Sequence, residues 1–181
     1  NLELGRQVGN PGDEIYRQAA DIFHQWLQED IFIQEEKPAF YYYVQDFNVN
    51  GIPKTRTGFL CGMKAEGYQT GTVIPHEQTL PHHKSQRLKL LQYSRANFSP
   101  IFGVYAQEDK RVDQILAKAA AQKGNPDIDL NDCLNERHRI WVIDDEVVIH
   151  EIIKSLTPLP IYIADGHHRY ETASTFAEHA M

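Results

Sequence analysis

The residues best suited to chemistry form one continuous stretch, Asp-Gly-His-His-Arg-Tyr-Glu-Thr-Ala at positions 165–173. The stretch follows an apolar run at 161–164, bounded by Pro160 and Gly166, which is typical of a buried strand. Apolar residues then recur at helical spacing, so the stretch opens a helix. Because a helix start presents unpaired N–H groups that favour anions, the sequence predicts a phosphate or anion site here.

Each polar residue of this turn has a candidate role. Gly166 permits the sharp bend, and the Arg169 guanidinium suits phosphate or carboxylate. The imidazoles of His167 and His168 can donate to phosphate or move a proton, and being adjacent on a helix they point in different directions. Asp165 can hold hydrated Mg²⁺, orient an imidazole, act as a base or cap the helix. We expect Gly166, His168 and Arg169 to bind phosphate, and Asp165 and His167 to take part in catalysis. The alternative for either histidine is a packed, hydrogen-bonded side chain.

A second polar segment begins at His76. Within it, Glu77 is a candidate general base, and His76 and Thr79 are candidate substrate contacts. Lys84 and Arg87 are three residues apart, so on a helix they share a face and can contact phosphate. The alternative is a solvated loop with scattered charge.

The two segments together also permit a metal site. Its candidate ligands are His76, Glu77, His82, His83, Asp165, His167 and His168. Zinc accepts histidine and carboxylate ligands, but this spacing matches no closed structural zinc pattern. Leu80 also rules out a His-Glu-x-x-His motif. A metal-dependent hydrolase is therefore an alternative function.

The composition narrows the classes of partner. A chain of 181 residues with 41% hydrophobic and 24% charged residues has globular composition. Its net charge of −7 disfavours binding to nucleic acid, which usually needs a basic protein face. A small anionic ligand is compatible with this charge, because it needs only a local positive pocket. No apolar run approaches the roughly 20 residues of a membrane span. Two cysteines, Cys61 and Cys133, make no disulfide framework, so we expect buried reduced thiols and a cytoplasmic protein.

Both helices and strands are expected to position the site. Helices are predicted over 12–29, 84–97 and 109–123 and after Asp144-Asp145; strands are predicted over 39–47, 55–63, 100–105, 139–143 and 161–164. The second half alternates strand and helix, which is typical of an α/β sheet. The first half is a helix and a hairpin, so an α+β fold is the alternative. We expect one domain over 1–181, and the ends, Asn1 and Met181, indicate a fragment of a longer chain.

The chain resembles a bacterial and archaeal family of unknown function, domain-of-unknown-function family ten-fifteen. The similarity rests on the 165–173 stretch together with His-Glu-Gln-Thr at 76–79, and it covers essentially the whole chain. Other matching pieces lie at 55–58, 71–77, 97–101 and 140–141. Members of the family are longer at both ends, in agreement with a fragment.

The chain also resembles, more distantly, the ParB and sulfiredoxin-like superfamily, which sets a Gly-x-x-Arg turn against nucleotide phosphates. The resemblance implies a mixed sheet with a strand-helix segment inserted around 98–156, which accounts for the 88 residues between Glu77 and Asp165. His167 takes the position of the sulfiredoxin cysteine, so sulfinic acid reduction is not expected.

ParB-like free-serine kinases are the more similar branch of that superfamily. By this resemblance Glu77 is the base toward a substrate hydroxyl, Asp165 assists the base or Mg²⁺, and His167, His168 and Arg169 hold the phosphate. The sequence thus predicts a nucleotide-binding protein that is an ATP- or ADP-dependent phosphotransferase acting on a small molecule. A nucleotide or anion sensor without turnover is the other alternative.

Overall fold

The chain folds into two compact units assembled from interleaved segments. The computed structural model describes residues 12–77 and 81–180, apart from the side chains of 81–85, 179 and 180. Unit 1 is drawn from residues 1–34, 64–105 and 160–181, and unit 2 from residues 35–63 and 106–159. The mixed α/β class predicted from the sequence is confirmed.

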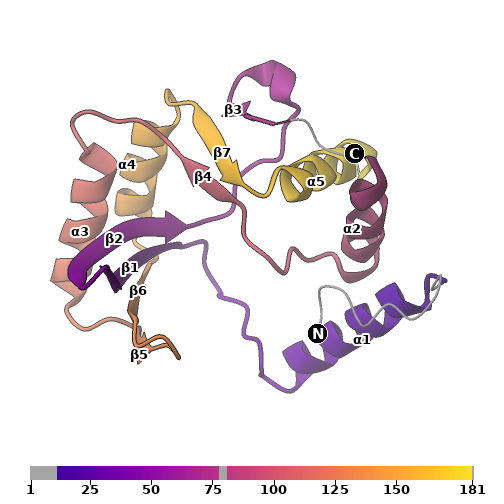
Figure 1. The fold of residues 1–181 in the computed structure, drawn as a ribbon, viewed down its shortest axis with the longest axis horizontal. Coiled ribbons are helices and arrows are strands. Elements are labelled where there is room, and N and C mark those ends of the chain that lie inside the picture. The colour runs from indigo at the N-terminus through magenta and orange to yellow at the C-terminus, as the bar shows by residue number, and fades with distance from the viewer. Residues whose placement is uncertain (1–11, 78–80, 181) are drawn as a thin grey trace. The chain divides into compact units, whose positions relative to one another are not determined.

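Unit 2 is an antiparallel four-stranded sheet with two helices (Figure 1). Its elements are β1 (Phe40–Val49), β2 (Ile52–Leu60), α3 (Arg111–Lys123), β5 (Ile128–Asn131), β6 (Arg137–Ile143) and α4 (Glu146–Leu156). The strand order is β2-β1-β6-β5. Helix α3 packs on β1, β6 and α4, and it buries Val112 and Leu116 completely. Asp145 caps α4 by accepting from the backbone N–H groups of Val147 and Val148, as an aspartate before a helix should.

Unit 1 holds the predicted site and contains a smaller sheet of three strands (Figure 1). Its elements are α1 (Glu14–Gln28), η1 (Tyr68–Thr70), β3 (Val73–Ile74), α2 (Pro81–Ser94), β4 (Phe102–Val104), β7 (Ile161–Asp165) and α5 (His167–Ala180). The central strand β7 pairs in parallel with β3 and antiparallel with β4. Helix α2 packs against both α1 and α5.

The core of unit 1 lies directly behind the predicted site. Val73, Ile163 and Tyr170 form a buried cluster, against which Tyr68 and Ile101 pack. The rings of Tyr68 and Tyr170 stack with centroids 5.4 Å apart. The Tyr170 hydroxyl donates to the backbone oxygen of Glu66 at 2.8 Å. Because Tyr170 lies one turn into α5, this packing fixes the start of that helix.

Several local expectations need correction. Both cysteines are free, but Cys61 and Cys133 are exposed rather than buried, because one follows the end of edge strand β2 and the other lies in the turn between β5 and β6. Strands β3 and β5 were not expected, and both are short. Within the described parts of the chain, every helix is too short or too polar to cross a membrane. The single domain with a segment inserted at 98–156 stays a prediction; residues 106–159 share unit 2 with the β1–β2 hairpin.

Candidate functional site

The turn between β7 and α5 depends on glycine. Gly166 has φ +97°, a conformation that other residues rarely adopt, and a Cβ there would lie 2.8 Å from Nε of Arg169. The guanidinium therefore folds back over this turn only because position 166 has no side chain. The backbone N–H of Tyr170 donates to the Gly166 carbonyl at 3.0 Å and is the first hydrogen bond of the helix. In helices generally, the N–H groups of the first turn have no carbonyl one turn back within the helix.

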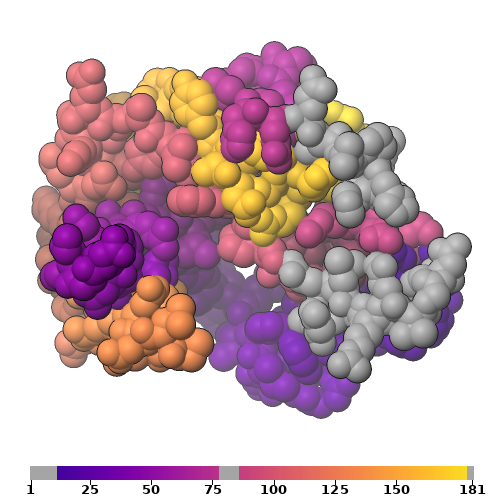
Figure 2. Space-filling view, in the orientation of Figure 1, coloured from indigo at the N-terminus to yellow at the C-terminus, as the bar shows by residue number. Residues whose placement is uncertain are grey.

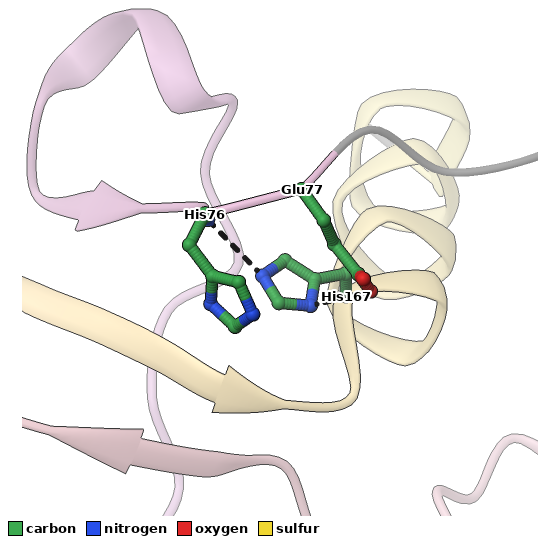
Figure 3. A group of neighbouring side chains, drawn as sticks. All are labelled: His76, Glu77 and His167. Atoms are coloured by element: carbon green, nitrogen blue, oxygen red, sulfur yellow. Dashed lines mark hydrogen bonds and ion pairs between the residues drawn. The ribbon is translucent and has the colours of Figure 1, made fainter.

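Glu77 and His167 meet at this turn although 90 residues separate them. Nδ1 of His167 lies 3.0 Å from Oε1 of Glu77 (Figure 3). The parallel pairing of β3 with β7 sets Ile74 opposite Tyr162, and this pairing carries the segment after β3 to the start of α5. The His167 ring is 2% exposed, whereas the Glu77 side chain is 55% exposed. A buried imidazole thus holds a carboxylate that solvent can reach.

The hydrogen bonds of His167 identify its tautomer. The backbone N–H of His76 points at Nε2 of His167 at 3.3 Å. Since a backbone N–H can only donate, Nε2 accepts and the proton of the neutral ring lies on Nδ1. Nδ1–H then donates to Glu77. Both ring nitrogens are occupied in this arrangement, so His167 positions Glu77 rather than facing open space.

His76 completes a cluster of three side chains, which we call the turn cluster (His76, Glu77 and His167). Nδ1 of His76 lies 2.7 Å from the Ile163 carbonyl, which can only accept, so Nδ1 carries the proton and Nε2 is the acceptor atom. The rings of His76 and His167 meet edge to face with centroids 4.4 Å apart (Figure 3). One ligand atom from each member of the cluster lies within 4.8 Å of the others.

The other side of the helix start is positively charged. Nη2 of Arg169 forms an ion pair with Oδ2 of Asp165, whose side chain is 73% exposed. Arg169 and Arg87 both line a small cavity of about 30 Å³ in unit 1. Its other lining residues are Leu90, Leu91, Ala96, Asn97, Phe98, Ser99 and Thr172. By volume the cavity has room for about two water molecules.

The remaining site residues predicted from the sequence differ in how far the structure describes them. His168 is half-buried on α5, and its backbone carbonyl accepts from Oγ1 of Thr172 at 2.6 Å. Thr79 lies outside the described residues, and so do the side chains of His82, His83 and Lys84. The structure therefore brings together His76 with Glu77 and His167, Asp165 with Arg169, and Arg87 with Arg169.

Sequence reasoning missed the loop at 97–99 and Thr172 as neighbours of Arg169. The sequence contained a signal for the loop, because residues 97–101 are among the segments on which the resemblance to family ten-fifteen was based. It also missed Glu66, whose backbone binds the Tyr170 hydroxyl through both its N–H and its carbonyl. Burial raises the pKa of both Tyr68 and Tyr170 above the ordinary value.

Comparison with known proteins gives one match. The model of a family described as "Protein of unknown function (DUF1015)" matches residues 1–181, in agreement with the resemblance to family ten-fifteen. No curated protein and no solved structure matches the chain. The likeness to the ParB and sulfiredoxin-like superfamily stays a prediction.

Proposed function

The chain belongs to the DUF1015 family of proteins of unknown function, and from the turn between β7 and α5 we propose that it binds a nucleotide and transfers a phosphoryl group to a small molecule. The contact between Glu77 and His167 carries this proposal. An exposed carboxylate that is held by a buried neutral imidazole is a suitable general base, and it lies beside a helix start that favours anions.

Phosphate binding is supported by the charges around the first turn of α5. A helix start favours an anion along its axis, and Arg169 and Arg87 both line one cavity beside that start. Arg169 has five N–H donors, so the pair with Asp165 leaves donors for phosphate. The positive groups supply the charge neutralisation that phosphoryl transfer requires.

The two sides of the turn act on one ligand because they flank the helix axis. His167 and Arg169 are two residues apart and so lie about 200° apart around a helix. A phosphate on the axis, bound by the helix amides, then has Arg169 on one side and the Glu77–His167 pair on the other. Glu77 removes the proton of the acceptor hydroxyl, and the hydroxyl oxygen forms a bond to phosphorus. The bond between that phosphorus and the oxygen of the departing nucleotide breaks, and its electron pair stays on the departing oxygen.

Asp165 is the residue that would hold Mg²⁺. Its exposed carboxylate uses one oxygen for Arg169 and keeps the other, which suits a cation bound through one carboxylate and substrate phosphates. When bound, Mg²⁺ would neutralise charge on the phosphates.

A second candidate function, a metal-dependent hydrolase, is favoured by the close spacing of the turn cluster. A cation there would replace the proton that His167 shares with Glu77, and Nε2 of His76 would complete the ligands. Metal analysis of protein purified without an affinity tag distinguishes the hydrolase from the phosphotransferase. One equivalent of zinc, lost in His76→Gln, supports the hydrolase.

A thermal-shift screen tests nucleotide binding, using ATP, ADP and inorganic phosphate with and without Mg²⁺. A nucleotide at a hundred times its dissociation constant adds about 2.7 kcal/mol of stability. Arg169→Lys loses the planar fork, so affinity falls about tenfold, or about 1.4 kcal/mol. The control is Arg111→Lys, which alters an exposed pair with Glu151 in unit 2. Equal shifts in both variants, or none in the wild type, would contradict the phosphate site.

A further inference from the structure

Unit 2 contains a second group of histidine and carboxylate side chains, independent of the proposed function. Asp132, Glu136 and His138 each place one ligand atom within 4.8 Å of the others. We call them the hairpin cluster because they lie at the turn between β5 and β6 and at the start of β6. This segment, in orange, reaches the molecular surface beside the β1–β2 hairpin (Figure 2). We propose that the hairpin cluster binds a divalent transition-metal cation of the Zn²⁺ class.

The histidine is set up as a ligand. Nδ1 of His138 lies 2.6 Å from the Tyr43 hydroxyl. Its Nε2 is buried and makes no well-formed hydrogen bond among the described residues, and Oδ2 of Asp132 lies 3.4 Å from it. Metal-binding histidines commonly donate one ring N–H to an outer partner and direct the other nitrogen at the ion. In the tautomer whose Nδ1–H donates to the Tyr43 hydroxyl, the lone pair of Nε2 is available to a cation.

Asp132 has one oxygen engaged and one available. Its Oδ1 accepts from the backbone N–H groups of Leu134 and Glu136 at 2.9 and 2.8 Å, which fixes the turn. Its Oδ2 lies 3.4 Å from Nε2 of His138. Ligands of a tetrahedral zinc ion at 2.0–2.1 Å are separated from one another by about 3.3 Å. The observed spacing therefore fits two neighbouring ligands of one ion.

Glu136 is held in the same way. Its Oε2 accepts from Nε2 of Gln45 at 2.5 Å, and Arg56 in turn donates to the Gln45 side-chain oxygen. Gln45 is 7% exposed, so this support is a buried polar side chain and not a mobile surface contact. Oε1 of Glu136 is left as the third ligand. One nitrogen and two oxygens, each oriented by a partner outside the cluster, suit Zn²⁺ with water in the fourth position.

Zinc titration of the whole chain, purified without an affinity tag and followed by calorimetry, tests the site. Asp132→Asn keeps a side-chain oxygen for the two turn amides but removes the charged ligand, so zinc affinity at this site falls at least tenfold. Glu136→Gln keeps an acceptor for Gln45 and should weaken zinc equally. Asp129→Asn is the control, because it removes a neighbouring acid that lies outside the hairpin cluster and pairs with Arg137.

Any of three outcomes would overturn the proposal. The first is that the wild type binds no zinc, and the second is that both amide variants bind zinc as the wild type does. The third is that Cys133→Ser removes the binding, which would assign it to the exposed thiol. Binding at the turn cluster is recognised separately, because only His76→Gln removes it. Two ligand variants keep the test valid if one of them fails to fold, which melting curves recorded without zinc will show.

Discussion

The turn cluster and the hairpin cluster contain the same kinds of side chain but differ in the contacts that the ring nitrogens of the histidine make. In the turn cluster, His167 has a partner at each ring nitrogen, one of them Glu77. In the hairpin cluster, Nε2 of His138 makes no well-formed hydrogen bond within the described chain, and its contact with Oδ2 of Asp132 is longer, at 3.4 Å. In our proposals, the first arrangement holds a carboxylate for proton transfer, and the second leaves a lone pair for a cation. The partner of the imidazole therefore decides the chemistry more than the residue types do.

The clusters also differ in how the chain brings them together. The hairpin cluster spans seven positions, 132–138, around one tight turn. The turn cluster joins residues 90 positions apart through the parallel pair of β3 and β7. A change at the β7–α5 turn should disrupt the turn cluster and leave the hairpin cluster intact.

Gly166→Ala should have the largest effect. The Cβ meets the Arg169 guanidinium and the φ of +97° is strained for alanine, which together cost about 1–3 kcal/mol. The thermal shift produced by nucleotide should vanish, while zinc binding at the hairpin cluster is retained. Gly58→Ala is the control, since a Cβ there meets nothing within 4 Å. A normal nucleotide shift in Gly166→Ala would contradict the account.

Replacing His167 should have the next largest effect and tests its positioning role. His167→Phe fills the buried space but removes the donor to Glu77 and leaves the His76 N–H unpaired, at a cost of about 1–3 kcal/mol. We expect kcat for phosphoryl transfer to fall at least tenfold with little change in KM. His167→Asn restores an N–H near Nδ1 and should recover part of kcat. If asparagine rescues nothing, the imidazole acts in another way.

The smallest effect concerns acid stability of unit 2. Backbone N–H donation from Glu136 holds the pKa of Asp132 below its ordinary value of 3.8. The ionised form therefore stabilises the fold above that value, and this stabilisation is lost as the pH falls through the lower, folded-state pKa. Asp132→Asn cannot titrate, so its urea midpoint should fall less than that of the wild type between about pH 5 and pH 2. If the urea midpoints of the two proteins fall in parallel with pH, the side-chain oxygen at position 132 stabilises the turn through its hydrogen bonds and not through its charge.

Local patterns in the sequence predicted most of the fold. Asp145 before α4 and the apolar run before Gly166 each determine the backbone within a few residues, so the elements that they mark are found. Strands β3 and β5 are two and four residues long, and neither has a periodicity of its own. They form because a neighbouring strand pairs with them, which a local pattern does not record.

The candidate site was predictable in its residue types but not in its contacts. The sequence indicated Glu77, Asp165, His167 and Arg169 by chemistry. The pairing of Glu77 with His167 and of Asp165 with Arg169 depends on strand register and on the bend at Gly166. The hairpin cluster was missed because an aspartate, a glutamate and a histidine around a turn between two strands also occur at ordinary exposed hairpins. Only the support from Tyr43 and Gln45 distinguishes it.

The most direct test of the central claim is Glu77→Gln, measured for both nucleotide binding and single-turnover phosphoryl transfer. Glutamine keeps an oxygen to accept from His167 but cannot take a proton, so the rate should fall about 10²–10⁴-fold while the nucleotide dissociation constant stays within about threefold. An unchanged rate would show that Glu77 is not the base. Full nucleotide binding with no product in the wild type would show that this turn senses the ligand without transforming it.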